Sequence, residues 1–233
     1  MNQFKRVGIL GGMGPQATLL LQQRVLDSVQ AEDDVSHLPL LVDMNPQVPS
    51  RLDWILHQQG NDPGPVLAQM AKGLETAGAQ ALAMPCNTAH HFSQSITDAV
   101  SIPLLNMLDM ASTAVTAKCE PNDNVGMLAS PATIGINLFE GLFAPHQLST
   151  VWPDDLGNIL ATIRRIKATG VSDTEINTMQ LAANQCIEKG AKCLVVGCTE
   201  FSLLSKQLDS SVPIIDTLDL LVARIHEFAM SCQ

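Results

Sequence analysis

The stretch Met84-Pro85-Cys86-Asn87-Thr88-Ala89-His90 comes directly after the apolar run Ala81-Leu82-Ala83 and directly before a helical pattern. We interpret it as a strand-to-helix turn that carries a cysteine. A side chain at such a turn lies at the carboxyl edge of a sheet, and its thiolate lies near the positive end of a helix. The stretch therefore predicts a place for chemistry.

The same arrangement occurs a second time in the chain. Residues 78–88 match residues 190–200, so that Cys86 and Cys198 each lie eight positions after a glycine. The repeat extends outward, because residues 102–109 resemble residues 212–219 and residues 7–10 resemble residues 125–128. This predicts two half-chains of one design, each with one cysteine at the same place.

Strand patterns alternate with helical patterns along the whole chain. Such alternation predicts parallel sheets with helices on both faces, connected in right-handed βαβ units. We therefore expect an α/β fold of two pseudo-symmetric parallel-sheet domains. Two such domains that face each other through their repeats would put the cysteines on opposite walls of a cleft, and a cleft between domains is a common ligand site.

The composition limits the class of partner. The chain has 233 residues, 46% of them apolar, and a formal net charge of −10. It therefore has no basic field for a nucleic acid or an anionic membrane surface, and we expect a small-molecule ligand instead. The N-terminal apolar run at residues 7–10 is too short for a signal sequence, and no stretch has the length of a membrane span, so we expect a cytoplasmic protein.

Four further cysteines lie in ordinary contexts. In a reducing compartment they need not pair, and we interpret them as small hydrophobic side chains or incidental thiols. They are Cys119, Cys186, Cys193 and Cys232.

Two loops at the carboxyl ends of predicted strands contain candidate binding groups. The run Gly11-Gly12-Met13-Gly14-Pro15 does not have the GxGxxG spacing of a dinucleotide site, and no Walker lysine follows it. It fits a close backbone approach to a small anion or a tight turn. The next loop ends at Arg51, which is a candidate clamp for a carboxylate or a solvated surface arginine.

Lys167 lies at the end of a predicted helix, where its positive charge would interact favourably with the helix dipole.

Two thiols on opposite faces of a tetrahedral carbon can remove a proton from one face and return one on the other. This reaction is racemisation or epimerisation. Asn87, Thr88 and Thr199 lie beside the two cysteines and offer donors for an α-carboxylate. The sequence shows no lysine context for pyridoxal phosphate and no metal-ligand cluster, so we expect no cofactor and no metal.

Three other hypotheses for the role of the two cysteines remain open. The two cysteines could form a redox pair, although the usual CxxC spacing is absent. Cys86, His90, His91 and Cys198 could bind zinc, although their spacing is not that of a known finger. The duplication could also carry inert cysteines in a binding module without turnover.

Three motifs resemble the aspartate/glutamate racemase superfamily, and its aspartate racemase branch in particular. They are GILGGMGPQAT at residues 8–18, MPCNTAH at 84–90 and GCTEFSLL at 197–204. The resemblance spans nearly the whole chain and implies a cofactor-independent, two-cysteine mechanism. It also implies a homodimer, and it implies domains at residues 1–98 plus 212–233, with Cys86, and at residues 99–211, with Cys198.

The resemblance also assigns roles to residues. It makes Cys86 and Cys198 the two bases, and gives Arg51 and Lys167 the substrate's side-chain carboxylate. The remaining expected substrate-binding residues are Gly12, Met13, Asn45, Asn87, Thr88, Thr199 and Glu200. The family usually has an acidic residue before the arginine and a threonine after it, whereas Ser50 and Leu52 stand here. The charge of the arginine is kept, but its local support is changed. The substrate that the resemblance implies is aspartate, with a broad-specificity racemase, a related isomerase or a small-anion binding module as alternatives.

Overall fold

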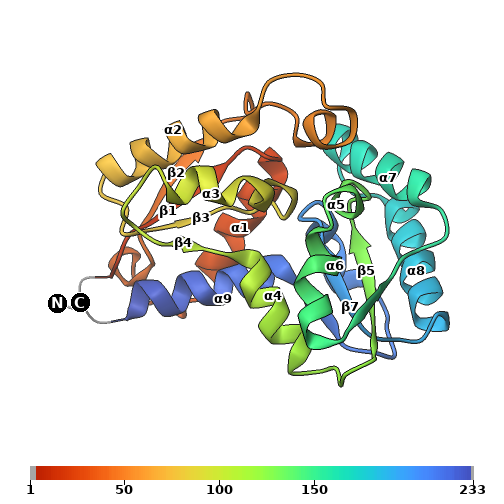
Figure 1. Cartoon of the computed structure of the whole chain (residues 1–233). Coiled ribbons are helices and arrows are strands. Elements are labelled where there is room, and N and C mark those ends of the chain that lie inside the picture. Colours follow the sequence, from red (N-terminus) through yellow and green to blue (C-terminus); the bar gives the residue numbers. More distant parts are fainter. Residues whose placement is uncertain (1–3, 232–233) are drawn as a thin grey trace. The chain divides into compact units, whose positions relative to one another are not determined.

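A computed structural model describes residues 4–231 of the chain, and Cys232 lies outside the described residues. The chain forms two compact units. The first runs from the N-terminus to Met107 and resumes at Leu218, and the second is Leu108–Thr217. Each contains one four-stranded parallel sheet, which confirms the predicted α/β class (Figure 1).

The sheet of the first unit has the strand order β2-β1-β3-β4. Its strands are β1 (Val7–Gly11), β2 (Leu40–Met44), β3 (Ala81–Ala83) and β4 (Leu104–Leu105). Its main helices are α1 (Pro15–Asp27), α2 (Pro63–Thr76), α3 (Ser93–Thr97) and α9 (Thr217–Met230). Figure 1 shows α2 and α3 on one face of this sheet and α1 on the other.

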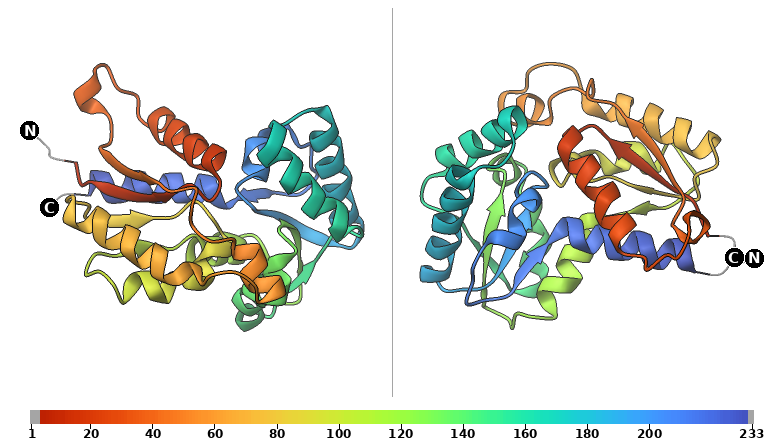
Figure 2. Two further views of the ribbon diagram at one scale, coloured as in Figure 1. Left: turned by 90° about the horizontal axis from the view of Figure 1, so that it is seen from above. Right: turned by 180° about the vertical axis from the view of Figure 1, so that it is seen from behind.

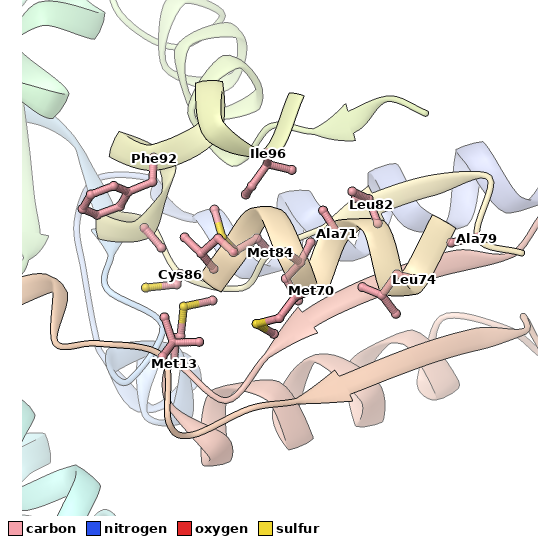
Figure 3. Packing of buried hydrophobic residues seen from close by; sticks show 14 residues of the cluster. Met13, Met70, Ala71, Leu74, Ala79, Leu82, Met84, Cys86, Phe92 and Ile96 are labelled. Carbon is pink, nitrogen blue, oxygen red and sulfur yellow. The ribbon is translucent and has the colours of Figure 1, made fainter. Parts of the chain in front are cut away.

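One hydrophobic cluster of the first unit lies between its sheet and α2. Asp62 caps α2 by accepting a hydrogen bond from the Gly64 amide at 2.8 Å, and Pro63 stands in the first turn, where its missing N–H costs nothing. The buried face of α2 then packs Leu67, Met70 and Leu74 against the strands. The cluster extends to Met13 and Cys86 at the carboxyl edge of the sheet, where Figure 3 shows both side chains at the same end.

The sheet of the second unit has the equivalent order β6-β5-β7-β8. Its strands are β5 (Asn124–Ala129), β6 (Ser149–Val151), β7 (Ala191–Gly197) and β8 (Ile214–Asp216). Its helices are α4 (Met107–Thr116, whose first residue belongs to the first unit), α5 (Ala132–Gly135), α6 (Leu138–Phe143), α7 (Leu156–Thr169) and α8 (Asp173–Glu188). The views of Figure 2 show α7 and α8 as adjacent helices.

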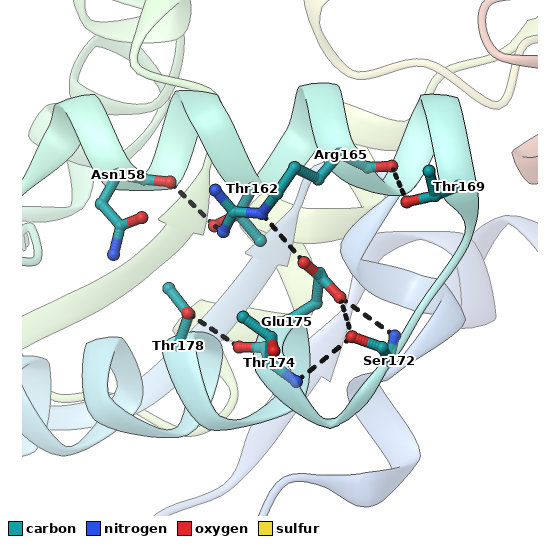
Figure 4. Close-up of polar contacts among 8 residues, drawn as sticks. All are labelled: Asn158, Thr162, Arg165, Thr169, Ser172, Thr174, Glu175 and Thr178. Carbon is teal, nitrogen blue, oxygen red and sulfur yellow. Dashed lines mark hydrogen bonds and ion pairs between the residues drawn. The ribbon is translucent and has the colours of Figure 1, made fainter.

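Helices α7 and α8 are joined by a polar network at their connection (Figure 4). Ser172 and Glu175 form a capping box at the start of α8. The buried Glu175 carboxylate also accepts a hydrogen bond from Arg165 Nε of α7 at 2.9 Å. The hydrogen bonds from Ser172, followed by that from Arg165, lower the pKa of Glu175 to about 2. The network fixes the end of α7, which carries Lys167.

Strand pairing shows where the chain passes between the units. β4 pairs with β3 and therefore belongs to the first sheet, although the expected boundary at residue 98 left it in the second domain. β8 pairs with β7 and belongs to the second sheet, although the expected boundary at residue 212 assigned it to the first domain. In the described part of the chain, no helix combines the length and apolar character needed to cross a membrane.

Candidate active site

Cys86 lies just after β3, a central strand of the first sheet. The Cys86 amide donates to the Met84 carbonyl at 2.8 Å, which turns the chain sharply at the strand end. The side chain is buried, with 8% of the residue exposed, and Asn87 beside it is 2% exposed. In a sheet of this order, the strand order reverses between β1 and β3, and ligands bind at the carboxyl ends of strands at such a switch point.

The loop after β1 supplies the other side of this switch point. Gly12 has φ +94°, and a Cβ there would lie 2.4 Å from the Asn45 carbonyl, so only glycine fits. The Gly12 amide donates to Thr18 Oγ1 at 3.0 Å, and the Asn45 amide donates to the Gly11 carbonyl at 3.3 Å. The structure thus brings Gly12 and Asn45 together, and Met13 shares the hydrophobic cluster of Cys86.

Arg51 lies half-buried at the end of the loop that follows β2. Its Nη1 donates to the carbonyls of Val48 and Pro49, at 3.1 and 2.9 Å, so the guanidinium folds back onto its own loop. Its Nε is buried and has no hydrogen-bond partner among residues 4–231. A buried donor without an acceptor is costly, so this N–H is suited to donate a hydrogen bond to an anionic ligand.

Cys198 lies just after β7, the strand of the second sheet that corresponds to β3. Gly197 before it allows close packing, since a Cβ there would lie 2.6 Å from the Phe139 ring. Cys198 is 7% exposed, and its thiol donates to Glu200 Oε2 at 3.0 Å. Glu200 and Thr199 are themselves buried.

The electrostatics of this turn keep the Cys198 thiol protonated at neutral pH. Burial, and then the charge and hydrogen bond of Glu200, raise the pKa of Cys198 well above its ordinary value, while the charge of Lys167 acts in the opposite direction. Lys167 Nζ of α7 lies 3.2 Å from Glu200 Oε1. The structure therefore groups three of the predicted site residues, Lys167, Cys198 and Glu200, with Glu200 between the other two.

His90 is a buried residue of the Cys86 turn, only 3% exposed. Its Nδ1 lies 2.9 Å from the Cys86 carbonyl oxygen, and its Nε2 accepts a hydrogen bond from the Met107 amide at 3.2 Å. Burial lowers the pKa of His90 to about 4, so the ring is neutral at physiological pH. Both ring nitrogens are occupied, which removes His90 from the zinc site considered above, and residues 4–231 contain no cluster of three potential metal ligands.

Sequence reasoning missed a second buried polar group in the Cys198 turn. Ser202 and Ser205 donate to the two carboxylate oxygens of Asp216, each at 2.7 Å. Asp216 ends β8 and is 6% exposed. The spacing was a usable signal, because Ser202 follows Cys198 by the same four positions by which His90 follows Cys86.

The other described cysteines lie away from these turns. The thiols of Cys119 and Cys193 are in contact, with their Sγ atoms 3.3 Å apart. Burial raises the pKa of Cys186 to about 11. All three are buried and free of disulfides. They occupy the interior of the second unit and have the surroundings of structural thiols.

Known proteins share this architecture. A structure of aspartate racemase from Picrophilus torridus is 25% identical, with a TM-score of 0.84 over 98% of this chain and 96% of that chain. An aspartate racemase homologue from Pyrococcus horikoshii is 21% identical, with a TM-score of 0.77 over 97% of this chain and all of that one (100%). Glutamate racemase from Francisella tularensis, solved with D-glutamate, is 16% identical, with a TM-score of 0.69 over 97% of this chain and 80% of that chain.

Sequence comparison agrees with the structural likeness. A broad specificity amino-acid racemase of Bacillus subtilis is 22% identical over an alignment of 219 residues that covers 91% of this chain and 92% of that protein. The family Asp/Glu/Hydantoin racemase matches residues 10–225, a span that includes both cysteine turns, Arg51 and Lys167. The chain belongs to the Asp/Glu/hydantoin racemase family.

Proposed function

We propose that this protein interconverts L- and D-aspartate without a cofactor, with Cys86 and Cys198 as the two acid–base groups. One observation carries the proposal. Each of the two sheets has a buried cysteine within three residues of the end of the equivalent central strand, at the point where the strand order reverses. Membership of a racemase family supports the reaction class.

The reaction requires one thiolate and one thiol. The thiolate removes the α-proton, which breaks the Cα–H bond and leaves a carbanion stabilised by the site. The thiol then gives its proton to the opposite face of the same carbon. The substrate is inverted, and the two cysteines have exchanged protonation states.

The environment of Cys198 supports a division of roles. Its raised pKa makes it the proton donor in the form described by the structure. In the reverse direction the Cys198 thiolate removes the α-proton and the Cys86 thiol returns one to the opposite face. The Glu200 carboxylate then accepts the hydrogen bond of the Cys198 thiol that results. Lys167 Nζ lies 3.2 Å from the other oxygen of Glu200.

Arg51 supports a dicarboxylic substrate. Its positive charge is half-buried in an acidic protein, and its buried Nε has no partner within residues 4–231. A carboxylate is the natural acceptor for such a guanidinium. We therefore propose that Arg51 binds the side-chain carboxylate of aspartate, while Asn87, Thr88 and Thr199 bind the α-carboxylate and amino group.

A broad-specificity racemase is the second candidate. The Bacillus subtilis relative is a broad specificity amino-acid racemase. The position of Lys167 also favours it, because Glu200 at 3.2 Å offsets the lysine charge that would otherwise help to select a second carboxylate. In this case Arg51 would add affinity for acidic substrates without excluding neutral ones.

Exchange of the α-proton in D₂O tests the proposal. We would incubate the enzyme with L-aspartate, L-glutamate and L-alanine, and follow loss of the α-proton by NMR and enantiomer composition by chiral chromatography. Aspartate leading the panel supports an aspartate racemase, and equal rates for all three support the broad-specificity candidate. No exchange with any amino acid contradicts both.

Variants and additives test the mechanism. Cys86→Ser and Cys198→Ser should each reduce racemisation by at least about 100-fold, because each removes one proton-transfer group. Circular dichroism would establish that both variants fold. Full activity in either variant contradicts the two-base mechanism, and dependence on pyridoxal phosphate or loss of activity in EDTA contradicts cofactor independence.

We also propose that the protein is a homodimer. Light scattering after size-exclusion chromatography would measure its molecular mass in solution.

A further inference from the structure

We infer that His90 is a positioning residue for Cys86. Its neutral imidazole bridges the Cys86 carbonyl and the Met107 amide, and so holds the cysteine turn against the end of the neighbouring strand. This inference rests on the proposed role of Cys86 in catalysis, although one arm of its test does not require racemisation.

The two hydrogen bonds fix the tautomer of the ring. A backbone N–H can only donate, so the Met107 amide requires an unprotonated Nε2. The neutral ring then carries its proton on Nδ1, which donates to the Cys86 carbonyl oxygen at 2.9 Å. His90 therefore uses its one donor and its one acceptor, and has no free nitrogen with which to transfer a proton to a ligand.

The bridge spans parts of the first unit that are distant in sequence. His90 and Cys86 lie in the turn after β3, whereas Met107 follows β4 and begins α4. β3 and β4 are paired, but β4 has only two residues, so its pairing gives limited support to the strand end. The imidazole adds a buried side-chain connection beyond the last pair of the ladder, at the carbonyl of the reactive residue itself.

The second unit has an equivalent connection made from different residues. Ser202 holds the same place after Cys198 that His90 holds after Cys86, and it donates to Asp216 at the end of β8. The carbonyl of Cys198 is held instead by a backbone bond from Phe201, at 2.9 Å. Both units thus tie the cysteine turn to the end of the next strand, and in the first unit the side chain that does so also holds the cysteine carbonyl.

Accurate placement of this carbonyl matters because the Cys86 side chain leaves the same residue. A misplacement of about 1 Å at a reacting group can cost about 100-fold in rate. Substitution of His90 should therefore lower kcat while leaving KM nearly unchanged, because binding of the substrate does not involve the imidazole. A general loss of folded protein would also lower the apparent kcat at constant KM, so kcat is calculated per folded enzyme, with the folded fraction measured by circular dichroism.

Two conservative variants separate the two bonds. The amide of His90→Asn occupies the place of Nδ1 and can still donate to the Cys86 carbonyl, but it cannot reach Met107. The amide of His90→Gln occupies the place of Nε2 and can accept from Met107, but it loses the donor to Cys86. We expect kcat to fall about 10- to 100-fold in His90→Gln and clearly less in His90→Asn. His91→Gln is the matched control, because His91 is the exposed neighbour, and its kcat should be that of the wild type.

Alkylation by iodoacetamide, followed cysteine by cysteine with peptide mass spectrometry, gives the second readout. Release of the turn should speed alkylation of Cys86 in His90→Gln without changing that of Cys198. Ser202→Ala should do the reverse. Wild-type kcat and wild-type Cys86 alkylation in both His90 variants overturn the inference, as does an equal change at both cysteines. If Cys86→Ser still racemises, the proposed function fails, while the alkylation arm still decides whether His90 holds the turn.

Discussion

The thiol of Cys198 donates a hydrogen bond to the carboxylate of Glu200, and their Sγ and Oε2 atoms are 3.0 Å apart. Both residues are buried, and Glu200 lies between Cys198 and Lys167. Two effects therefore raise the pKa of Cys198, namely its burial and the neighbouring Glu200 carboxylate. The charge of Lys167 acts against them and lowers it.

Replacement of Glu200 by glutamine should lower the pKa of Cys198, because it removes the carboxylate charge next to the thiol. The pH profile of Cys198 alkylation, measured by mass spectrometry, should move to lower pH. Racemisation should fall by about 100-fold, since the Glu200 carboxylate no longer holds Cys198 as the thiol that donates the proton. An unchanged alkylation profile would contradict the assigned cause of the raised pKa.

Lys167→Met should shift the pH profile of Cys198 alkylation in the opposite direction to Glu200→Gln. Loss of the lysine charge should raise the pKa of Cys198 further and slow its alkylation at a fixed pH. Lys72→Met is a suitable control, because it removes the same charge from an exposed position of the first unit. If both lysine variants slow Cys198 equally, net charge and not the contact at Glu200 determines its reactivity.

Arg51→Ala should lower kcat/KM for aspartate by at least about 100-fold, because the loss of a charged hydrogen-bond donor leaves a desolvated carboxylate unpaired. Alanine racemisation should change by less than about threefold, since that substrate has no second carboxylate. The two substrates would be compared in steady-state assays, with Arg164→Ala as an exposed-arginine control. Equal losses for aspartate and alanine would show that Arg51 supports the loop and does not select the substrate.

Glu175→Gln should lower Tm at neutral pH, because the capping box and the bond to Arg165 require the carboxylate. The folded-state pKa of Glu175 is lowered from 4.5 to about 2, so its contribution to stability is complete above pH 4.5 and is lost as the pH falls toward 2. Thermal melts across this range should bring the wild type and the variant together. A constant difference in Tm would mean that packing, not charge, holds the α7–α8 connection.

His90 should make the protein less stable in weak acid. Burial lowers its pKa from 6.5 to about 4, so between these values the unfolded state binds more protons than the folded state. Stability should therefore fall as the pH drops from 6.5 to 4, by about 3 kcal/mol at most from this group. Urea unfolding of the wild type and His90→Asn would measure it, and the advantage of the wild type should shrink over that window. Parallel curves for the two proteins would exclude the buried imidazole as the cause.

The repeat in the sequence was sufficient to predict the two sheets and the places of Cys86 and Cys198, because strand-to-helix turns are local features. Contacts between side chains that are distant in the sequence could not be predicted in the same way. The contact of Lys167 with Glu200 depends on how α7 packs beside β7, and periodicity alone does not contain that packing. The bridge from His90 to Met107 likewise depends on the register of β3 with β4, so the sequence alone indicates His90 only as a possible zinc ligand.

The domain boundaries expected at residues 98 and 212 differ from those of the structure for a related reason. The segments around β4 and β8 have the same pattern in both halves, and only strand pairing shows that each belongs to the sheet that precedes it along the chain. As a result the chain changes units at Met107/Leu108 and at Thr217/Leu218, one residue into α4 and one residue into α9.

The position of α9 has a consequence for the order of events during synthesis. This helix completes the first unit, where Asp219 pairs with Arg24 at 2.8 Å and the Ala229 carbonyl accepts from the Lys5 amide at 3.0 Å. Residues 108–216 of the second unit leave the ribosome before it. The half that is begun first is therefore finished last, and its sheet must wait for a partner helix while Leu108–Thr217 can already fold.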